Sequence, residues 1–121
     1  MFYENDLVAR QIEALVQIAS KILFGSNCVS YEKKGDVTDE LYDRINSLIE
    51  EREFGECEDL IYDNFDLSND EYLVLAIDYY HRLNAFDDDT LESADFDRDE
   101  VRDGLMDFMR KCGIPADAMA V

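Results

Sequence analysis

Apolar residues dominate the stretch 69–86, which contains the run EYLVLAIDYYHRLNAF. The polar side chains inside the run are few, chiefly Asp78, His81 and Arg82. A helix that is apolar around most of its circumference must be covered on several sides. The run is too long for a buried strand, and it carries too much charge to span a bilayer. We predict that it forms the central helix of a helical domain, with Asp78 and Arg82 on an exposed stripe.

Capping residues predict where the helices begin. Ser68 and Glu71 have the spacing of a capping box at the start of the central helix, and Asp97 and Glu100 repeat it near the end of the chain. Thr38 is a good N-cap for a helix in between, because its hydroxyl oxygen can accept a free backbone N–H.

Helical periodicity elsewhere predicts an all-α domain covering residues 1–121. We expect an N-terminal helix at about 6–24, capped by Asn5 or Asp6, then a polar loop at 25–37. A helical-hairpin core follows at 38–113, and a loose tail at 114–121. The predicted architecture is a bundle of about five or six helices built from antiparallel hairpins.

Within this core, glycines and aspartates refine the boundaries. Two short amphipathic helices within 38–66 form one hairpin, and residues 87–92 form one short turn capped by an early aspartate. Gly25 and Gly113 are placed to end the first and last helices, and Pro115 prevents the last helix from continuing.

Composition narrows the functional classes. The chain has 121 residues, 47% hydrophobic residues and a formal net charge of -19. Binding to nucleic acid or to an anionic membrane is disfavoured, since both depend on Lys and Arg. The acidic surface is interpreted either as solvation alone or as attraction to a basic protein or to divalent cations.

The three cysteines follow no disulfide or metal-binding pattern. Cys57 and Cys112 fall on predicted apolar faces and are expected to be buried thiols. Cys28 lies in a loop and is the one candidate for reactivity. The N-terminus MFYENDL lacks the basic region of a signal peptide, so we expect free thiols in the cytoplasm.

The segment REFGECEDLIYDNFDL resembles the second helix of a tetratricopeptide-type hairpin. Phe54, Cys57 and Ile61 occupy the aromatic, small and large apolar positions of that pattern. Ile45 and Asn64 stand where it has small residues, and no second copy follows at the family's period. The resemblance implies a tetratricopeptide-like hairpin without a repeat array.

A broader resemblance covers most of the chain. The segments RQIEALVQIASKILFG, EREFGECEDLIYDNF and LAIDYYHRLNAFDDDTLESADFDRDEVRDGLMD occur in this order. Together they resemble a family of small, acidic, all-helical proteins of unassigned function from Gram-positive bacteria. The resemblance implies a fold and a cytoplasmic setting, and it carries over no catalytic residues.

Two groups of polar residues are candidate sites, and each also has a structural explanation. Asp95, Asp97 and Asp99 alternate like the first ligands of an EF-hand, but the glycine and the bidentate glutamate of that loop are missing. His81 is the only histidine, and Asp78, three residues earlier, could hydrogen-bond to it; no nucleophile motif accompanies it. We therefore assign no catalytic, cofactor-binding or metal-binding residues.

We interpret the chain as a small cytoplasmic protein-interaction or adaptor module with an unidentified protein partner, for which a basic protein is one candidate. The alternatives are a carboxylate-based metal-dependent hydrolase and an acidic nucleic-acid mimic that binds a basic protein. The first helix either completes the core or forms a homodimer, because its apolar residues are widely spread: Leu7, Val8, Ile12, Leu15, Val16, Ile18, Ala19, Ile22 and Leu23.

Overall fold

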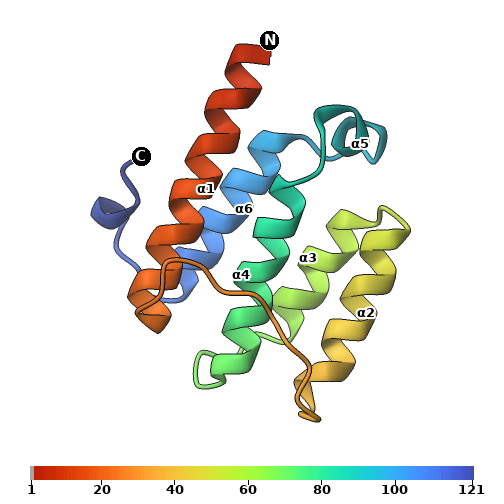
Figure 1. Ribbon diagram of the computed structural model, residues 1–121, viewed down its shortest axis with the longest axis vertical. Helices are drawn as coiled ribbons and strands as arrows, with labels where there is room; N and C mark the ends of the chain where they lie inside the picture. The colour runs from red at the N-terminus through yellow and green to blue at the C-terminus, as the bar shows by residue number, and fades with distance from the viewer. Residues whose placement is uncertain (1) are drawn as a thin grey trace.

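The computed structural model describes residues 2–121, with side chains from Asp6 onward, and shows an all-α protein (Figure 1). The described range contains six α-helices and one short 3-10 helix, joined by connections, and it contains no strand. No helix in it is long and apolar enough to cross a membrane. The helices are α1 (Phe2–Phe24), α2 (Thr38–Glu50), α3 (Phe54–Asp63), α4 (Asp70–Asn84), α5 (Asp88–Ser93) and α6 (Arg98–Lys111), followed by the 3-10 helix η1 (Ala116–Met119).

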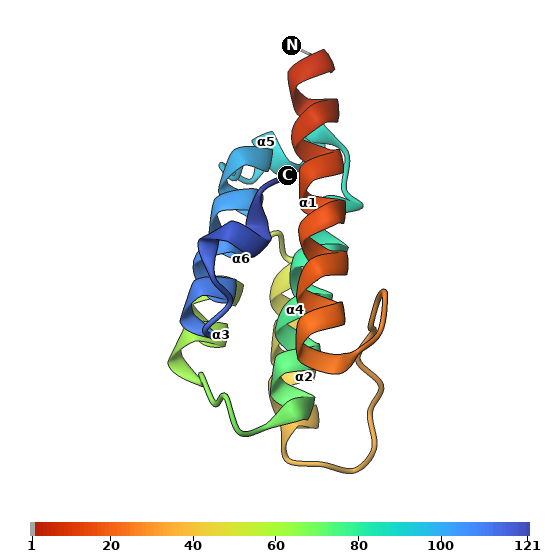
Figure 2. The ribbon, with the colours of Figure 1, turned by 90° about the vertical axis from the view of Figure 1, so that its left-hand side faces the viewer.

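The central position predicted for α4 is confirmed. It packs against α1, α6 and α2, while α1 packs along α6 and α2 pairs with α3 in an antiparallel hairpin (Figures 1 and 2). Two buried tyrosines join α4 to α3: Tyr72 donates its O–H to the carbonyl of Ile61 at 2.6 Å, and Tyr79 to that of Phe54 at 2.8 Å. These bonds satisfy phenolic groups that would otherwise be buried without partners.

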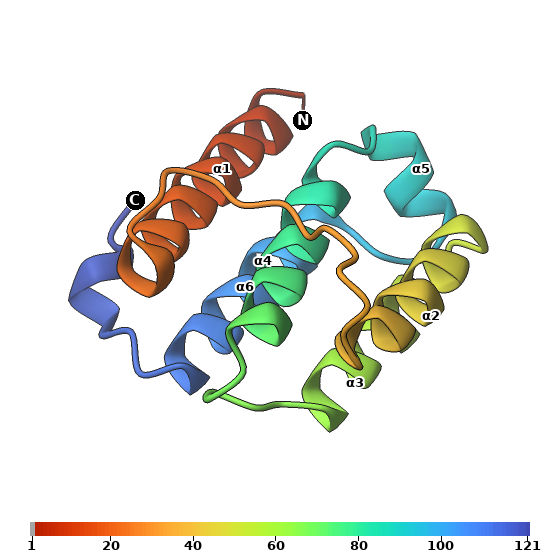
Figure 3. The same ribbon diagram turned by 60° about the horizontal axis from the view of Figure 1, so that its bottom comes forward.

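The exposed stripe predicted on α4 is wrong, because Asp78 is only 7% exposed. The connection 25–37 crosses over α4 on its way from α1 to α2 and covers this side of the helix (Figure 3). Arg82 donates to the side-chain oxygen of Asn46 in α2 at 2.6 Å, and no ion pair between it and Asp78 is seen among the described contacts.

The start of α4 also differs from the prediction. Asn69, not Ser68, is the N-cap, and its side-chain oxygen accepts the backbone N–H of Tyr72. Ser68 instead donates its hydroxyl to Asp66 at 2.6 Å. Asn is as good a cap as Ser, so the helix begins one residue later without losing the bond.

Two other predicted caps are also wrong. Thr38 is the first residue of α2 rather than its cap; the carboxylate of Asp36 accepts the backbone N–H of Thr38 at 3.3 Å. The first helix begins at Phe2, so Asn5 and Asp6 lie inside it. No Gly or Pro precedes them from Phe2 onward to stop the helix from extending toward the N-terminus.

The beginning and end of α6 are as predicted. Asp97 and Glu100 form both bonds of a capping box. At the other end Gly113 has a φ of +89°, and Ile114 donates its N–H to the carbonyl of Met109 at 3.0 Å. This is the Schellman arrangement, which satisfies a terminal carbonyl and favours glycine at the left-handed position.

The tail beyond α6 is ordered, contrary to the prediction of a loose end. Residues Ala116–Met119 form η1, which packs against α1. Met119 is 3% exposed and Ile114 is 4% exposed. Burying these two apolar side chains favours the docked tail, an effect that is not visible in the local sequence.

Candidate functional site

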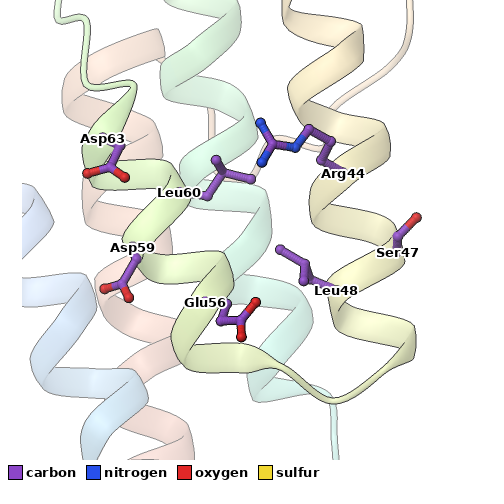
Figure 4. Close-up of a pocket in the computed structure, with 7 residues that line it drawn as sticks. All are labelled: Arg44, Ser47, Leu48, Glu56, Asp59, Leu60 and Asp63. Atoms are coloured by element: carbon purple, nitrogen blue, oxygen red, sulfur yellow. The ribbon is translucent and has the colours of Figure 1, made fainter.

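A groove open to solvent runs between the two helices of the hairpin, with a volume of about 460 Å³. Leu48 of α2 and Leu60 of α3 face each other across it and form its apolar floor (Figure 4). We call this the α2–α3 groove, and its residues are Arg44, Ser47, Leu48, Glu56, Asp59, Leu60 and Asp63.

Carboxylates line the α3 side of this groove and continue past it. Glu56, Asp59 and Asp63 are exposed, and the ten residues of α3 include no Lys or Arg. A second hollow of about 570 Å³ lies between α3 and α6 and is lined by Glu58, Tyr62, Glu100, Asp103, Gly104, Asp107 and Lys111. The exposed surface of α3 is therefore strongly negative on both sides.

Glu58 is the most constrained carboxylate of this surface. Tyr80 donates its O–H to Glu58 Oε2 at 2.7 Å. A side chain at Gly104 of α6 would overlap the Glu58 carboxylate, so Glu58 would have to move aside to make room for it. Burial raises the pKa of Glu58 despite the Tyr80 bond, and Asp59 and Asp107 raise it further.

We expect Glu58→Gln to stabilise the protein at pH 7, because it removes a charge that burial disfavours. Because the folded-state pKa of Glu58 is raised, its contribution is most favourable below the unfolded-state pKa and is lost as the pH rises through the folded-state value. Glutamine can still accept the Tyr80 O–H, but it carries no charge. Urea unfolding at pH 7 and pH 4 measures the effect, which should nearly vanish at pH 4. A less stable Gln variant at pH 7 would contradict this account.

The carboxylate of Asp39 holds several residues of the connection 25–37. Asp39 accepts the hydroxyl of buried Tyr31 and the backbone N–H of Gly35 at 2.7 Å. These bonds, with the Tyr31 bond the strongest cause, lower the pKa of Asp39. Lys33 and Lys34 are exposed and form ion pairs with Asp43 and Glu71, both at 3.0 Å.

This anchored connection brings Cys28 to His81. The Sγ atom of Cys28 lies 3.8 Å from Nδ1 of His81, and Nε2 of the same ring lies 3.3 Å from Oε1 of Glu13. The partner expected for His81 was Asp78, but both ring nitrogens instead face groups from other segments. Sequence reasoning missed Glu13, because nothing local relates it to residues 15 and 68 positions away.

The other sequence candidates have structural roles. Asp97 caps α6, Asp99 lies 3.6 Å from Arg102, and Asp95 occupies a turn with a φ of +56°. Among residues 6–121, whose side chains the structure describes, no group of three or more His, Cys, Asp or Glu is arranged to hold a metal ion.

The cysteines are distributed as predicted. All three are free, and Cys28 alone is exposed. Burial raises the pKa of the Cys57 thiol to about 12 and that of Cys112 to about 11. Phe54, Cys57 and Ile61, which carry the tetratricopeptide resemblance, are at most 1% exposed, and they form the buried face of α3.

Comparison with known proteins gives a family and nothing beyond it. A search of curated proteins and a search of solved structures found no match. One family model matches residues 2–113, and its description is a family of unknown function. The match extends from the start of α1 to beyond the end of α6. The chain therefore belongs to the DUF6483 family of unknown function.

Proposed function

We propose that the protein is a cytoplasmic interaction module that binds a basic, amphipathic helix of a partner protein in the α2–α3 groove. The observation that carries the proposal is the pairing of an apolar floor with an acidic edge. Leu48 and Leu60 are half-buried and point into the groove with Glu56 beside them, while Asp59 and Asp63 lie along the outer edge of α3, away from α2 (Figure 4). An amphipathic helix lying in a groove buries its apolar side chains on such a floor.

Charge complementarity selects a basic partner. The α3 edge supplies three exposed carboxylates, against one guanidinium, Arg44, on the α2 edge. The formal net charge of -19 also attracts a basic segment over longer distances and repels acidic ones. The half-buried leucines favour an amphipathic helix as the partner. A nucleic-acid mimic needs carboxylates in place of phosphates, but it has no use for an apolar floor.

The proposal is tested with a fluorescent helical peptide that carries leucines along one face and lysines along the other. Asp59→Lys/Asp63→Lys should weaken its binding at least about ten-fold, measured by fluorescence anisotropy at physiological salt. A peptide of the same composition, scrambled to remove the apolar face, should bind weakly to every variant.

A matched control separates the groove from overall charge. Glu32→Lys/Glu92→Lys makes the same change in net charge at exposed positions in the 25–37 connection and α5. It should leave the affinity almost unchanged. Equal loss in both double variants, or equal binding of both peptides, would show nonspecific attraction and overturn the proposal.

A homodimer through α1 stays a separate prediction, and the structure limits which residues could form it. Ile12, Leu15 and Val16 are 0% exposed within the protein's own core. From Asp6 onward, the large apolar side chains of α1 that are most exposed are Leu7, 43% exposed, and Ile22, 51% exposed.

A further inference from the structure

We propose that Cys28 is a thiol modification site at which His81 and Glu13 prepare the sulfur for reaction with a low-molecular-weight disulfide. The three side chains come from the 25–37 connection, α4 and α1. One nitrogen of the imidazole contacts the thiol, and the other contacts the carboxylate. The groove proposed for partner binding lies between α2 and α3, so this site is independent of that function.

The neighbours of His81 favour one tautomer of its ring. An ionised Glu13 can only accept, so we assign the proton to Nε2, which lies 3.3 Å from Glu13 Oε1. Nδ1 is then the unprotonated acceptor that faces the Cys28 sulfur at 3.8 Å. A histidine placed this way can take the thiol proton, and the carboxylate stabilises the imidazolium that forms.

The reaction is an exchange of one disulfide for another. The Cys28 proton moves to His81 Nδ1, and the thiolate attacks one sulfur of the reagent R–S–S–R. The S–S bond of the reagent breaks as the new Cys28–sulfur bond forms, so Cys28 is oxidised and the departing sulfur is reduced. The departing thiolate takes the proton from His81 and leaves as R–SH.

The exposure of Cys28 and the burial of the other two cysteines favour a stable mixed disulfide at Cys28. Cys28 is exposed, and the side chains of His81 and Glu13 are 36% and 46% exposed, so a small reagent can reach the sulfur. A reagent of this kind needs no enclosed pocket. Cys57 is 0% exposed and Cys112 is 9% exposed, so neither is placed at the surface to attack the adduct and resolve it.

The first test is the rate at which the folded protein reacts with 5,5′-dithiobis(2-nitrobenzoate) at pH 7. One thiol should react rapidly, and Cys28→Ser should abolish this phase. His81→Gln should slow the phase about ten-fold, since an ordinary thiol is only a few per cent ionised at this pH. Mass spectrometry after treatment with cystamine should place one adduct on Cys28.

The second test addresses Glu13, whose proposed role is to position His81. Because His81 is the only histidine, ¹⁵N-histidine NMR reports its tautomer directly. Glu13→Ala should shift the ring from the Nε2–H tautomer toward a mixture and slow the thiol reaction about three-fold. Glu92→Ala, on the exposed surface of α5, should change neither property.

Circular dichroism melting curves confirm that each variant is folded. If Cys28 in the parent reacts no faster than in His81→Gln, or no faster than the thiol of a short unfolded peptide containing it, Cys28 is only an exposed cysteine and the proposal fails. An unchanged tautomer in Glu13→Ala would remove Glu13 from the site.

Discussion

Replacing Leu15 with glutamate should unfold the protein at room temperature, with a loss of about 5 kcal/mol. Leu15 is 0% exposed, on the face of α1 that packs against α4 and α6. The substitution removes a core side chain and places a carboxylate where no charge or water can compensate it. Circular dichroism and urea unfolding measure the loss, and a cooperative melt near that of the parent would contradict the packing of α1.

Ile22→Glu is the matched control, since the same helix leaves Ile22 51% exposed. It should change the unfolding free energy by less than about 0.5 kcal/mol. It also tests the predicted homodimer, for which Leu15 is unsuitable. Light scattering across a salt series should show a dimer that strengthens as salt screens the charge, and Ile22→Glu should abolish it. A monomer at every salt and protein concentration would rule the dimer out.

Replacing Arg98 with alanine should cost about 3–5 kcal/mol, because Arg98 is a buried charge with several hydrogen bonds. Its side chain is 7% exposed, and Nη2 lies 2.8 Å from the carboxylate of Asp88. The guanidinium also donates to the carbonyl of Asn84 at 2.9 Å and to that of Phe86 at 2.7 Å. It thus holds the connection between α4 and α5 against the start of α6.

Arg98→Lys should recover less than half of this loss. Lysine keeps the charge but cannot reach several acceptors at once as a planar guanidinium does. Arg110→Ala is the control: Arg110 pairs with Asp107 at an exposed site and should cost less than about 1 kcal/mol. Urea unfolding of the three variants measures the differences. A lysine variant as stable as the parent would show that the charge alone, and not the fork of donors, is needed.

The sequence by itself determined the helical elements and their order. Helical periodicity marked α2, α3, α4 and α6, since the apolar residues of each recur on one side or, in α4, all round. Local capping chemistry placed Asp97 and Gly113 correctly. The prediction of Ser68 as the N-cap of α4 was wrong, because the adjacent Asn69 offers a similar side-chain acceptor. Capping preferences cannot decide between two neighbouring residues that cap almost equally well.

Tertiary packing alone decided what covers the polar side of α4 and what holds the tail. Asp78 was expected to be exposed, but it is buried, and a connection that is distant in sequence crosses over α4 (Figure 3). The apolar run around α4 already required cover on several sides, yet only the packed structure shows that the loop supplies part of it. The tail was expected to be loose for the same reason, since its partner, α1, lies at the other end of the chain.

The two candidate sites could be identified only from the folded structure. Negative charge is spread along the whole sequence, so only the pairing of α2 with α3 shows that carboxylates edge an apolar groove. Cys28, His81 and Glu13 were separate or unnoticed in the sequence, because each lies on a different segment. Sequence pattern acts over a few residues, through helical periodicity and backbone hydrogen bonds. Contacts between segments depend on how the helices pack, and that packing is set by the burial of the whole core.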